Sequence, residues 1–168
     1  MIGVILKNKS VGIYKFIWKA NYMNILIRKL KQSDFDNWSD LWEQYLNYYK
    51  TQLSEEIYTT TFSRLINPDI INQNAFVAEV DGRLVGLVHY VYHDDNWRLE
   101  KTSYLQDLFA SPDFRNLGIG RKLIEAVYQA ADENKTPSVY WLTEESNKTA
   151  RKLYDRIAKL SPFVVYER

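Results

Sequence analysis

The sequence predicts an α/β domain, and three observations support that prediction. From about residue 24 onward, strand-like and helix-like runs of apolar residues alternate along the chain. Asp81-Gly82 lies between two strand-like runs, which is typical of a two-residue hairpin turn. A turn with two glycines, residues 115–120, separates a strand-like run from a helix-like run. The 168 residues are enough for one domain with a single core.

The first predicted elements are a strand at 24–30 and two helices. Ser33 is a candidate N-cap for the first helix, because an acidic residue, Asp36, follows three positions later. The second helix is expected to begin after Ser54 and to stop at Asn67-Pro68. The apolar stripe of the first helix comprises Phe35, Trp38, Leu41, Trp42, Tyr45 and Tyr49, and that of the second comprises Ile57, Tyr58, Phe62, Leu65 and Ile66.

The rest of the chain predicts three strands followed by alternating helices and strands. The expected elements are strands at 75–80, 83–92 and 104–110, a helix near 118–134, a strand at 138–143, a helix near 147–158 and a last short strand at Phe163–Tyr166. No repeat or linker divides them, so residues 23–168 are expected to form a single domain.

The composition excludes several classes of function. With 22 basic and 21 acidic side chains, the formal net charge is +1, so no strong field attracts nucleic acid or a membrane surface. Cysteine is absent, which excludes disulfides, a cysteine nucleophile and cysteine–metal clusters. Only His89 and His93 could offer imidazole ligands, so we expect no metal site. Tyrosines that are candidates to line a pocket, rather than only to pack, are Tyr45, Tyr48, Tyr49, Tyr90 and Tyr92.

Residues 1–22 differ from the remainder of the chain. Their apolar start is interrupted by several lysines, and no run approaches the roughly 20 residues that span a bilayer. The order of charged and apolar residues is also wrong for a signal peptide. We therefore expect a cytoplasmic protein in which 1–22 is an extension of the domain. The alternative is an additional element that packs on the core.

The turn Arg115-Asn116-Leu117-Gly118-Ile119-Gly120 is the strongest candidate for a binding site. A glycine-bearing turn at a helix start presents unpaired backbone N–H groups and the positive end of the helix dipole, a combination that binds phosphate. There is no Gly-Lys-Ser/Thr, and the three-glycine dinucleotide fingerprint is incomplete, which disfavours a Rossmann-like nucleotide binder. The alternative is a simple capping turn.

Several motifs in order resemble one family. A strand, R-x-x-G-x-G, a helix, a second strand and then S-N-x-x-A-x-x-L-Y, over about 104–158, resemble the GNAT acyl-CoA-dependent N-acetyltransferases. Within the family, residues 136–154 look most like the branch of small histone/polyamine and amino-acid acetyltransferases, and Y-L-x-D-L-F resembles a strand of the diamine acetyltransferases. The resemblance implies a mixed central sheet with helices on both faces. It also implies an acyl-CoA cleft where strands 104–110 and 138–143 splay apart.

The resemblance also implies which residues hold acetyl-CoA as cosubstrate. These are Leu108, Phe109, Ala110, Arg115, Asn116, Leu117, Gly118, Ile119, Gly120, Arg121 and Asn147. Backbone groups of Leu108 and Ala110 are expected to pair with the pantetheine arm, and one amide there should face the developing oxyanion. The arginines could instead be solvated surface side chains, and Asn147 could be a helix N-cap.

The catalytic acid and base are less clearly marked. Tyr154 matches the family tyrosine that protonates the departing thiolate, although it also belongs to an apolar stripe. Gln106 stands where the diamine acetyltransferases have glutamate, and glutamine cannot take a proton. Asp107 is the expected substitute, but strand alternation directs it to the face opposite Gln106 unless a bulge re-aims it. Glu79, His89 and a water chain are the other options.

We therefore predict an N-acetyltransferase that acts directly on a primary amine, which could belong to a polyamine, an amino acid or a protein lysine. The alternative is a GNAT-fold module that binds acyl-CoA without turnover. Phe163–Tyr166 is apolar and β-prone, so a homodimer through this C-terminal strand is expected. Alternatively the strand only completes its own sheet.

Overall fold

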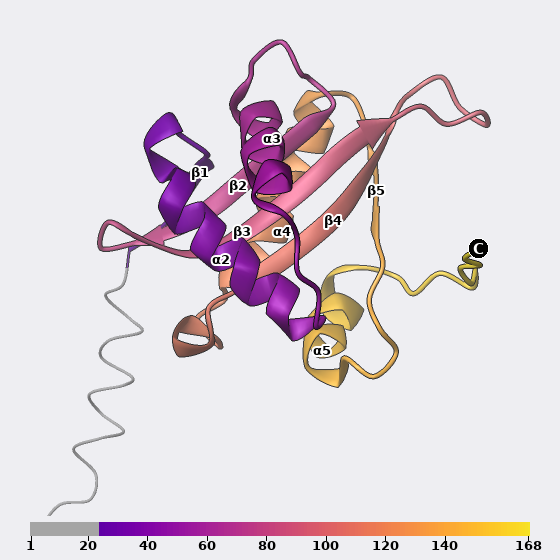
Figure 1. Ribbon diagram of the computed structural model, residues 1–168. Helices are drawn as coiled ribbons and strands as arrows, with labels where there is room; N and C mark the ends of the chain where they lie inside the picture. Colours follow the sequence, from indigo (N-terminus) through magenta and orange to yellow (C-terminus); the bar gives the residue numbers. More distant parts are fainter. Residues whose placement is uncertain (1–23) are drawn as a thin grey trace, which may run out of the picture.

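A computed structural model of the chain describes residues 24–168, and the prediction for residues 1–22 lies outside them. The described chain forms a five-stranded sheet between helices (Figure 1). Its elements are β1 (Ile25–Lys29), a 3₁₀ turn (Gln32–Asp34), α2 (Phe35–Tyr48), α3 (Glu55–Ile66), β2 (Gln73–Val80), β3 (Arg83–His93), β4 (Thr102–Ala110), a 3₁₀ turn (Pro112–Phe114), α4 (Ile119–Glu133), β5 (Ser138–Trp141) and α5 (Lys148–Ile157).

The sheet is mixed, as predicted. Its strand order is β1-β2-β3-β4-β5, with antiparallel pairing throughout except between β4 and β5, which are parallel. Helices α2 and α3 cover one face, and α4 lies on the other (Figure 1). Asp81 and Gly82 have φ values of 51° and 78°, so the hairpin between β2 and β3 turns through left-handed backbone, as a type I′ turn requires.

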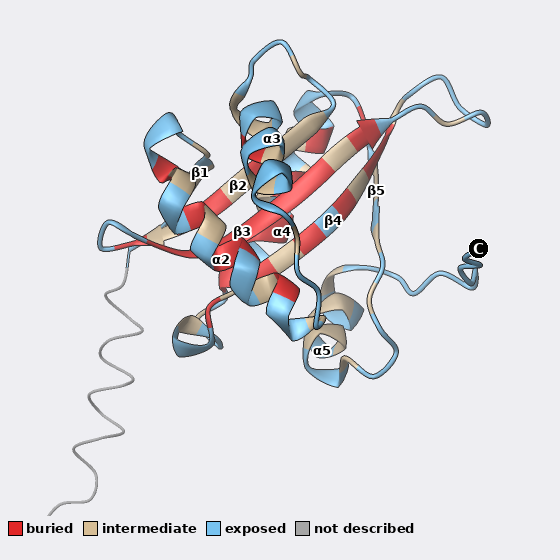
Figure 2. Ribbon diagram, in the orientation of Figure 1, coloured by how far each residue is buried: buried red, intermediate tan, exposed pale blue. Residues whose placement is uncertain are grey.

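Two apolar clusters form the core, one on each face of the sheet. On the α4 face, Leu123, Ile124 and Val127 are fully buried against the strands. On the other face, Trp38 and Phe62 pack from α2 and α3 onto the sheet. Figure 2 shows the buried residues concentrated along β3 and β4, the strands that carry the site.

The expectation that Ser33 caps the first helix is wrong, because the helix begins later. A turn of 3₁₀ helix precedes α2, and Asp34 occupies the cap position. The Asp34 carboxylate accepts from the Lys31 amide (2.8 Å) and pairs with Arg28 (2.6 Å), which fixes the turn one residue further along. Burial alone raises the pKa of this carboxyl, but the hydrogen bonds from Arg28 and Lys31 outweigh it, and the pKa lies below its usual value. The predicted cap at Ser54 is confirmed, since α3 starts at the next residue.

The predicted last strand at 163–166 is also wrong. The chain there is irregular, and its four side chains are 59–92% exposed (Figure 2). A strand needs a neighbour to pair its backbone groups and to bury one face. Phe163–Tyr166 has neither within residues 24–168, because the pairing of β5 is with β4 alone.

Candidate active site

The parallel pair β4 and β5 opens part of the way along β4. Pairing joins Thr102–Leu105 to Ser138–Trp141 and then ends, although β4 continues to Ala110. Beyond Leu105, the edge of β4 that faces β5 therefore has no strand partner in the described chain. A cavity of about 740 Å³ occupies this opening. The splayed strands agree with the expectation drawn from the motifs.

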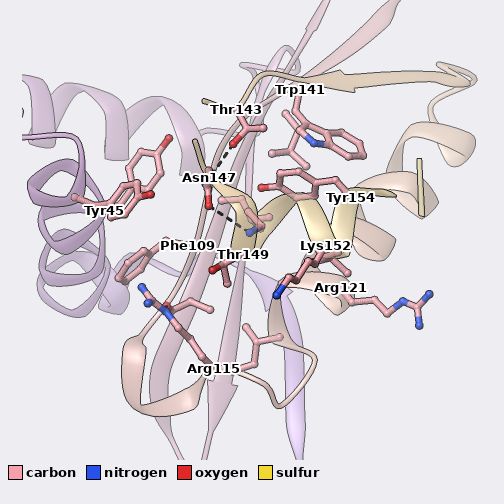
Figure 3. Close-up of a pocket in the computed structure, with 18 of the residues that line it drawn as sticks. Tyr45, Phe109, Arg115, Arg121, Trp141, Thr143, Asn147, Thr149, Lys152 and Tyr154 are labelled. Atoms are coloured by element: carbon pink, nitrogen blue, oxygen red, sulfur yellow. Dashed lines mark hydrogen bonds between the residues drawn. The ribbon is translucent and has the colours of Figure 1, made fainter. Parts of the chain in front are cut away.

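Five parts of the fold line this first cavity (Figure 3). They are the second half of β4, the turn before α4, the first residues of α4, the segment after β5, and α5, with tyrosines from the end of α2 opposite. Of the predicted cosubstrate-binding residues, those that line the cavity are Leu108, Phe109, Ala110, Arg115, Asn116, Gly118, Ile119, Gly120, Arg121 and Asn147. Leu117 does not line it, because its side chain packs against the core.

The turn before α4 presents unpaired backbone N–H groups beside open space. Gly118 caps the helix with φ = 80°, a left-handed conformation that side chains other than glycine rarely adopt. The first helical hydrogen bond runs from the Lys122 amide to the Gly118 carbonyl, so the amides before Lys122 have no helical carbonyl to bond. A Cβ atom on Gly118 would meet nothing within 4 Å, so the turn borders open space. These features fit a pyrophosphate group.

The cationic side chains around this turn are not equivalent. Arg115 lies beside the cavity, where its Nε donates to the Ala110 carbonyl (3.4 Å). Arg121 pairs with Glu125 (3.2 Å) and points away from the other labelled side chains (Figure 3). Lys152 on α5 also lines the cavity. Sequence reasoning missed Lys152, because it lies on the polar side of an amphipathic helix and resembles any solvated lysine.

Tyr154 serves both the core and the cavity. Its ring packs edge-on against Trp141, with centroids 5.2 Å apart, and its hydroxyl points into the cavity (Figure 3). Burial, with a smaller contribution from Tyr49, raises the pKa of the Tyr154 hydroxyl to about 12. The phenol therefore stays protonated at neutral pH and is a hydrogen-bond donor.

Asn147 caps α5, as one of its two interpretations required. Its side-chain oxygen accepts from the Ala150 amide (3.3 Å), and its Nδ2 donates to Thr143 Oγ1 (3.2 Å). The Asn147 side chain also lines the cavity, and its contact with the CoA arm stays a prediction.

A β-bulge on β4 sets the direction of the neighbouring side chains. His89 pairs with Asp107 and Tyr90 pairs with Leu105, which leaves Gln106 as the extra residue. Leu105 consequently packs on the α4 side, whereas Asp107 contacts Trp42 on the α2 side. Without the bulge, strand alternation would put Leu105 and Asp107 on the same face.

Asp107 belongs to a buried hydrogen-bonded chain that the sequence did not predict. The Trp38 indole N–H donates to His89 Nε2 (2.8 Å), so this nitrogen carries no proton. His89 Nδ1 must then carry the hydrogen and donate it to Asp107 Oδ2 (2.8 Å). Trp42 Nε1 donates to the same oxygen (3.2 Å). The imidazole is thus held as one neutral tautomer beside the carboxylate.

A second cavity of about 280 Å³ lies next to the first, between α3 and the sheet. Gln106, the bulge residue, borders both cavities. Asp107 and His89 line the second cavity and not the first. Glu79 lines neither, because it pairs with Arg28 (2.7 Å). The tyrosines Tyr45, Tyr48 and Tyr49 line the first cavity, and Tyr92 is a core residue.

The described residues also limit other kinds of site. Between residues 24 and 168, no group of three or more His, Asp or Glu side chains is placed to hold a metal ion. In the same range, no helix is both long and apolar enough to cross a membrane.

Comparison with known proteins agrees with this geometry. Residues 28–158 match the acetyltransferase (GNAT) family. The chain belongs to that family. It is an N-acetyltransferase, in agreement with its relatives.

Two of those relatives cover most of the chain. A D-amino-acid N-acetyltransferase, HPA3 of Saccharomyces cerevisiae, is 37% identical over 145 residues, which are 86% of this chain and 90% of the relative. An uncharacterized N-acetyltransferase of Archaeoglobus fulgidus is 31% identical over 137 residues, which are 75% of this chain and 88% of the relative.

Solved structures share the fold. The aminoglycoside N-acetyltransferase AAC(6')-Iy in complex with CoA has a TM-score of 0.75 at 17% identity, over 87% of this chain and 95% of the other. A ribosomal-protein-alanine N-acetyltransferase from Brucella melitensis biovar Abortus has a TM-score of 0.73 at 22% identity, over 86% of this chain and 98% of the other.

Proposed function

We propose that this protein transfers the acetyl group of acetyl-CoA directly to the primary amine of a small molecule. The observation that carries the proposal is the junction of the two cavities at the β4 bulge. The first cavity offers an anion-binding helix start, and the second offers the buried carboxylate of Asp107. Donor and acceptor can therefore approach each other from opposite sides of Gln106. A free amino acid is the favoured acceptor, because HPA3 is a D-amino-acid N-acetyltransferase.

Acetyl-CoA fits the first cavity. The unpaired amides at the start of α4 and the guanidinium of Arg115 suit the pyrophosphate. The edge of β4 beyond Leu105 can pair with an extended amide-bearing arm as a neighbouring strand would, through backbone groups of Leu108 and Ala110. The structural relative AAC(6')-Iy was solved in complex with CoA, which supports this assignment.

Tyr154 is the proposed general acid. The raised pKa, about 12, exceeds that of a thiol, about 8.5, so full transfer to a free thiolate is uphill. The hydroxyl must therefore donate while the carbon–sulfur bond is breaking, when the sulfur is most basic. A neutral phenol with its ring fixed against Trp141 is suited to that concerted step.

Asp107 is the proposed base. A free amine has a pKa near 10.4 and arrives protonated, so a group beside it must take a proton before attack. His89 and Trp42 both donate to Oδ2, so neither of them occupies Oδ1, and an ammonium can donate to that oxygen. The buried donors hold the carboxylate in one orientation at the floor of the second cavity.

The test is a screen of small amines with acetyl-CoA, read by release of free CoA thiol and by mass spectrometry of the product. We expect an acetylated amine in stoichiometric amount with the released thiol. Release of thiol without an acetylated amine, or no release with any amine, would contradict the proposal.

We also propose that two copies associate through the C-terminal segment. Phe163–Tyr166 offers four consecutive apolar side chains to solvent, and the outer edge of β5 carries no partner strand within residues 24–168. If the two copies paired these segments across a two-fold axis, the apolar side chains would be buried and the free edge of β5 would gain a neighbouring strand.

A further inference from the structure

We propose that Arg64 binds the carboxylate of a zwitterionic acceptor in the second cavity, so that the protein selects amino acids over diamines and polyamines. The inference rests on the proposed function and names the residue that would determine its acceptor class.

The second cavity has the size and walls of a small-molecule site. Its volume, about 280 Å³, lies just below the usual range of ligand pockets, which suits a small acceptor rather than a protein segment. The sheet forms its floor at the β4 bulge, and α3 covers it. Apolar and aromatic side chains that line it are Trp42, Leu53, Ile57, Leu65, Tyr90 and Val91. These residues suit an acceptor with an apolar side chain.

The charged residues of this cavity consist of one of each sign. Asp107 is buried, with 8% of its surface exposed, and is held by two donors. Arg64 is exposed in the last turn of α3 and has no hydrogen bond or ion pair to any residue from 24 to 168. His89 is the neutral tautomer. The cavity therefore has the Asp107 carboxylate at its buried end and, at its exposed end, the Arg64 guanidinium, which is paired with no residue from 24 to 168.

This arrangement complements an amino acid. Its ammonium can meet Asp107 near the acetyl donor, while its carboxylate meets Arg64, whose planar fork matches a carboxylate with two parallel hydrogen bonds. A diamine would instead bring a second ammonium toward the guanidinium, and like charges repel. The simpler role for Arg64 is a cation that interacts favourably with the C-terminal end of the α3 dipole. Any cation would serve that role, whatever the acceptor.

The test compares Arg64→Ala and Arg64→Lys with the parent protein on leucine, leucinamide and 1,4-diaminobutane. For Arg64→Ala, we expect KM for leucine to rise about 10- to 100-fold, the effect of losing a hydrogen-bonded charged pair, with kcat little changed. Lysine should restore only part of this, because it cannot bind bidentately. KM for acetyl-CoA should not change, since Arg64 does not line the first cavity. Lys29→Ala, an exposed cation on β1, is the matched control and should leave every constant unchanged.

The outcomes separate this inference from the proposed function. Equal effects of Arg64→Ala on leucine and leucinamide, or a parent enzyme that prefers 1,4-diaminobutane, would overturn the inference and leave acetyl transfer intact. If the parent acetylates none of these three amines, the amine screen still decides the proposed function, and binding decides the inference. Titration calorimetry of leucine into CoA-loaded protein should then show at least tenfold weaker binding by Arg64→Ala. Equal affinities would overturn the inference.

Discussion

Replacing Asp107 with asparagine should remove most of the acetyl transfer while the domain stays folded. The amide keeps the size of the side chain and one carbonyl oxygen, which can still accept from His89 and Trp42. Hydrogen bonds to charged groups contribute about 1.5–3 kcal/mol and those between neutral groups about 0.5–1.5 kcal/mol, so weakening two of them costs about 2 kcal/mol. In a domain of this size, that corresponds to a fall in Tm of about 4–8 °C.

The effect on rate should be much larger than the effect on stability. An amide cannot take a proton, and loss of one acid–base group lowers the rate by about 10²–10⁴. Asp107→Ala is the matched comparison, because it leaves two buried donors without an acceptor at about 1–3 kcal/mol each and should lower Tm further. Initial rates from thiol release and Tm from calorimetry should be measured on the same samples. Asp107→Asn with a rate within threefold of the parent would refute Asp107 as the base.

Four further perturbations test other parts of the structure. Gly118→Asp should abolish acetyl-CoA binding in calorimetry, because it adds a negative charge beside the anion site and strains a residue with φ = 80°; unchanged affinity would refute the phosphate-binding turn. Tyr154→Phe keeps the packed ring and should lower the rate by about 10²–10⁴ with little change in Tm, whereas unaltered turnover would make Tyr154 a core residue only. Because the folded pKa of Asp34 is depressed, its contribution to stability is present above the unfolded value of about 3.9 and is lost as pH falls through the folded pKa. Asp34→Asn should therefore melt below the parent at pH 7, and the gap should begin to shrink only below about pH 4, as pH falls toward the folded pKa; a gap that is constant with pH would contradict this. Val165→Lys should shift a dimer toward monomer in light scattering, and a parent that is monomeric at high concentration would argue against association through this segment.

Local signals were enough to predict most of the fold. The turns at Asp81-Gly82 and Gly118 could be predicted because left-handed backbone favours glycine, and the signal lies within a few residues of the turn itself. The helices were recognisable from their apolar stripes. Two local predictions were wrong. Asp34, which bonds to Arg28 and to the Lys31 amide, occupies the cap position predicted for Ser33. The β-prone run at 163–166 forms no strand, because no neighbouring strand pairs with it within residues 24–168.

The acceptor side of the site could not be predicted in the same way. The orientation of Asp107 depends on a bulge that is defined only by the pairing of β3 with β4. Its chain of partners joins residues 18, 51 and 65 positions apart, and no local pattern marks such contacts. In the sequence, Arg64 resembles any cation on a helix surface, and its place beside the second cavity depends on how α3 packs over the sheet. The cosubstrate side was accessible because its residues cluster within one strand–turn–helix unit.

The most direct test of direct transfer follows the acetyl group itself. The protein should be incubated with acetyl-CoA that carries a ¹³C-labelled acetyl group and with leucine, and all species should be weighed by mass spectrometry. Direct transfer predicts labelled N-acetyl-leucine in equal amount to free CoA, with no label on the protein. Label retained on the protein, or CoA released without labelled product, would contradict direct transfer to the amine.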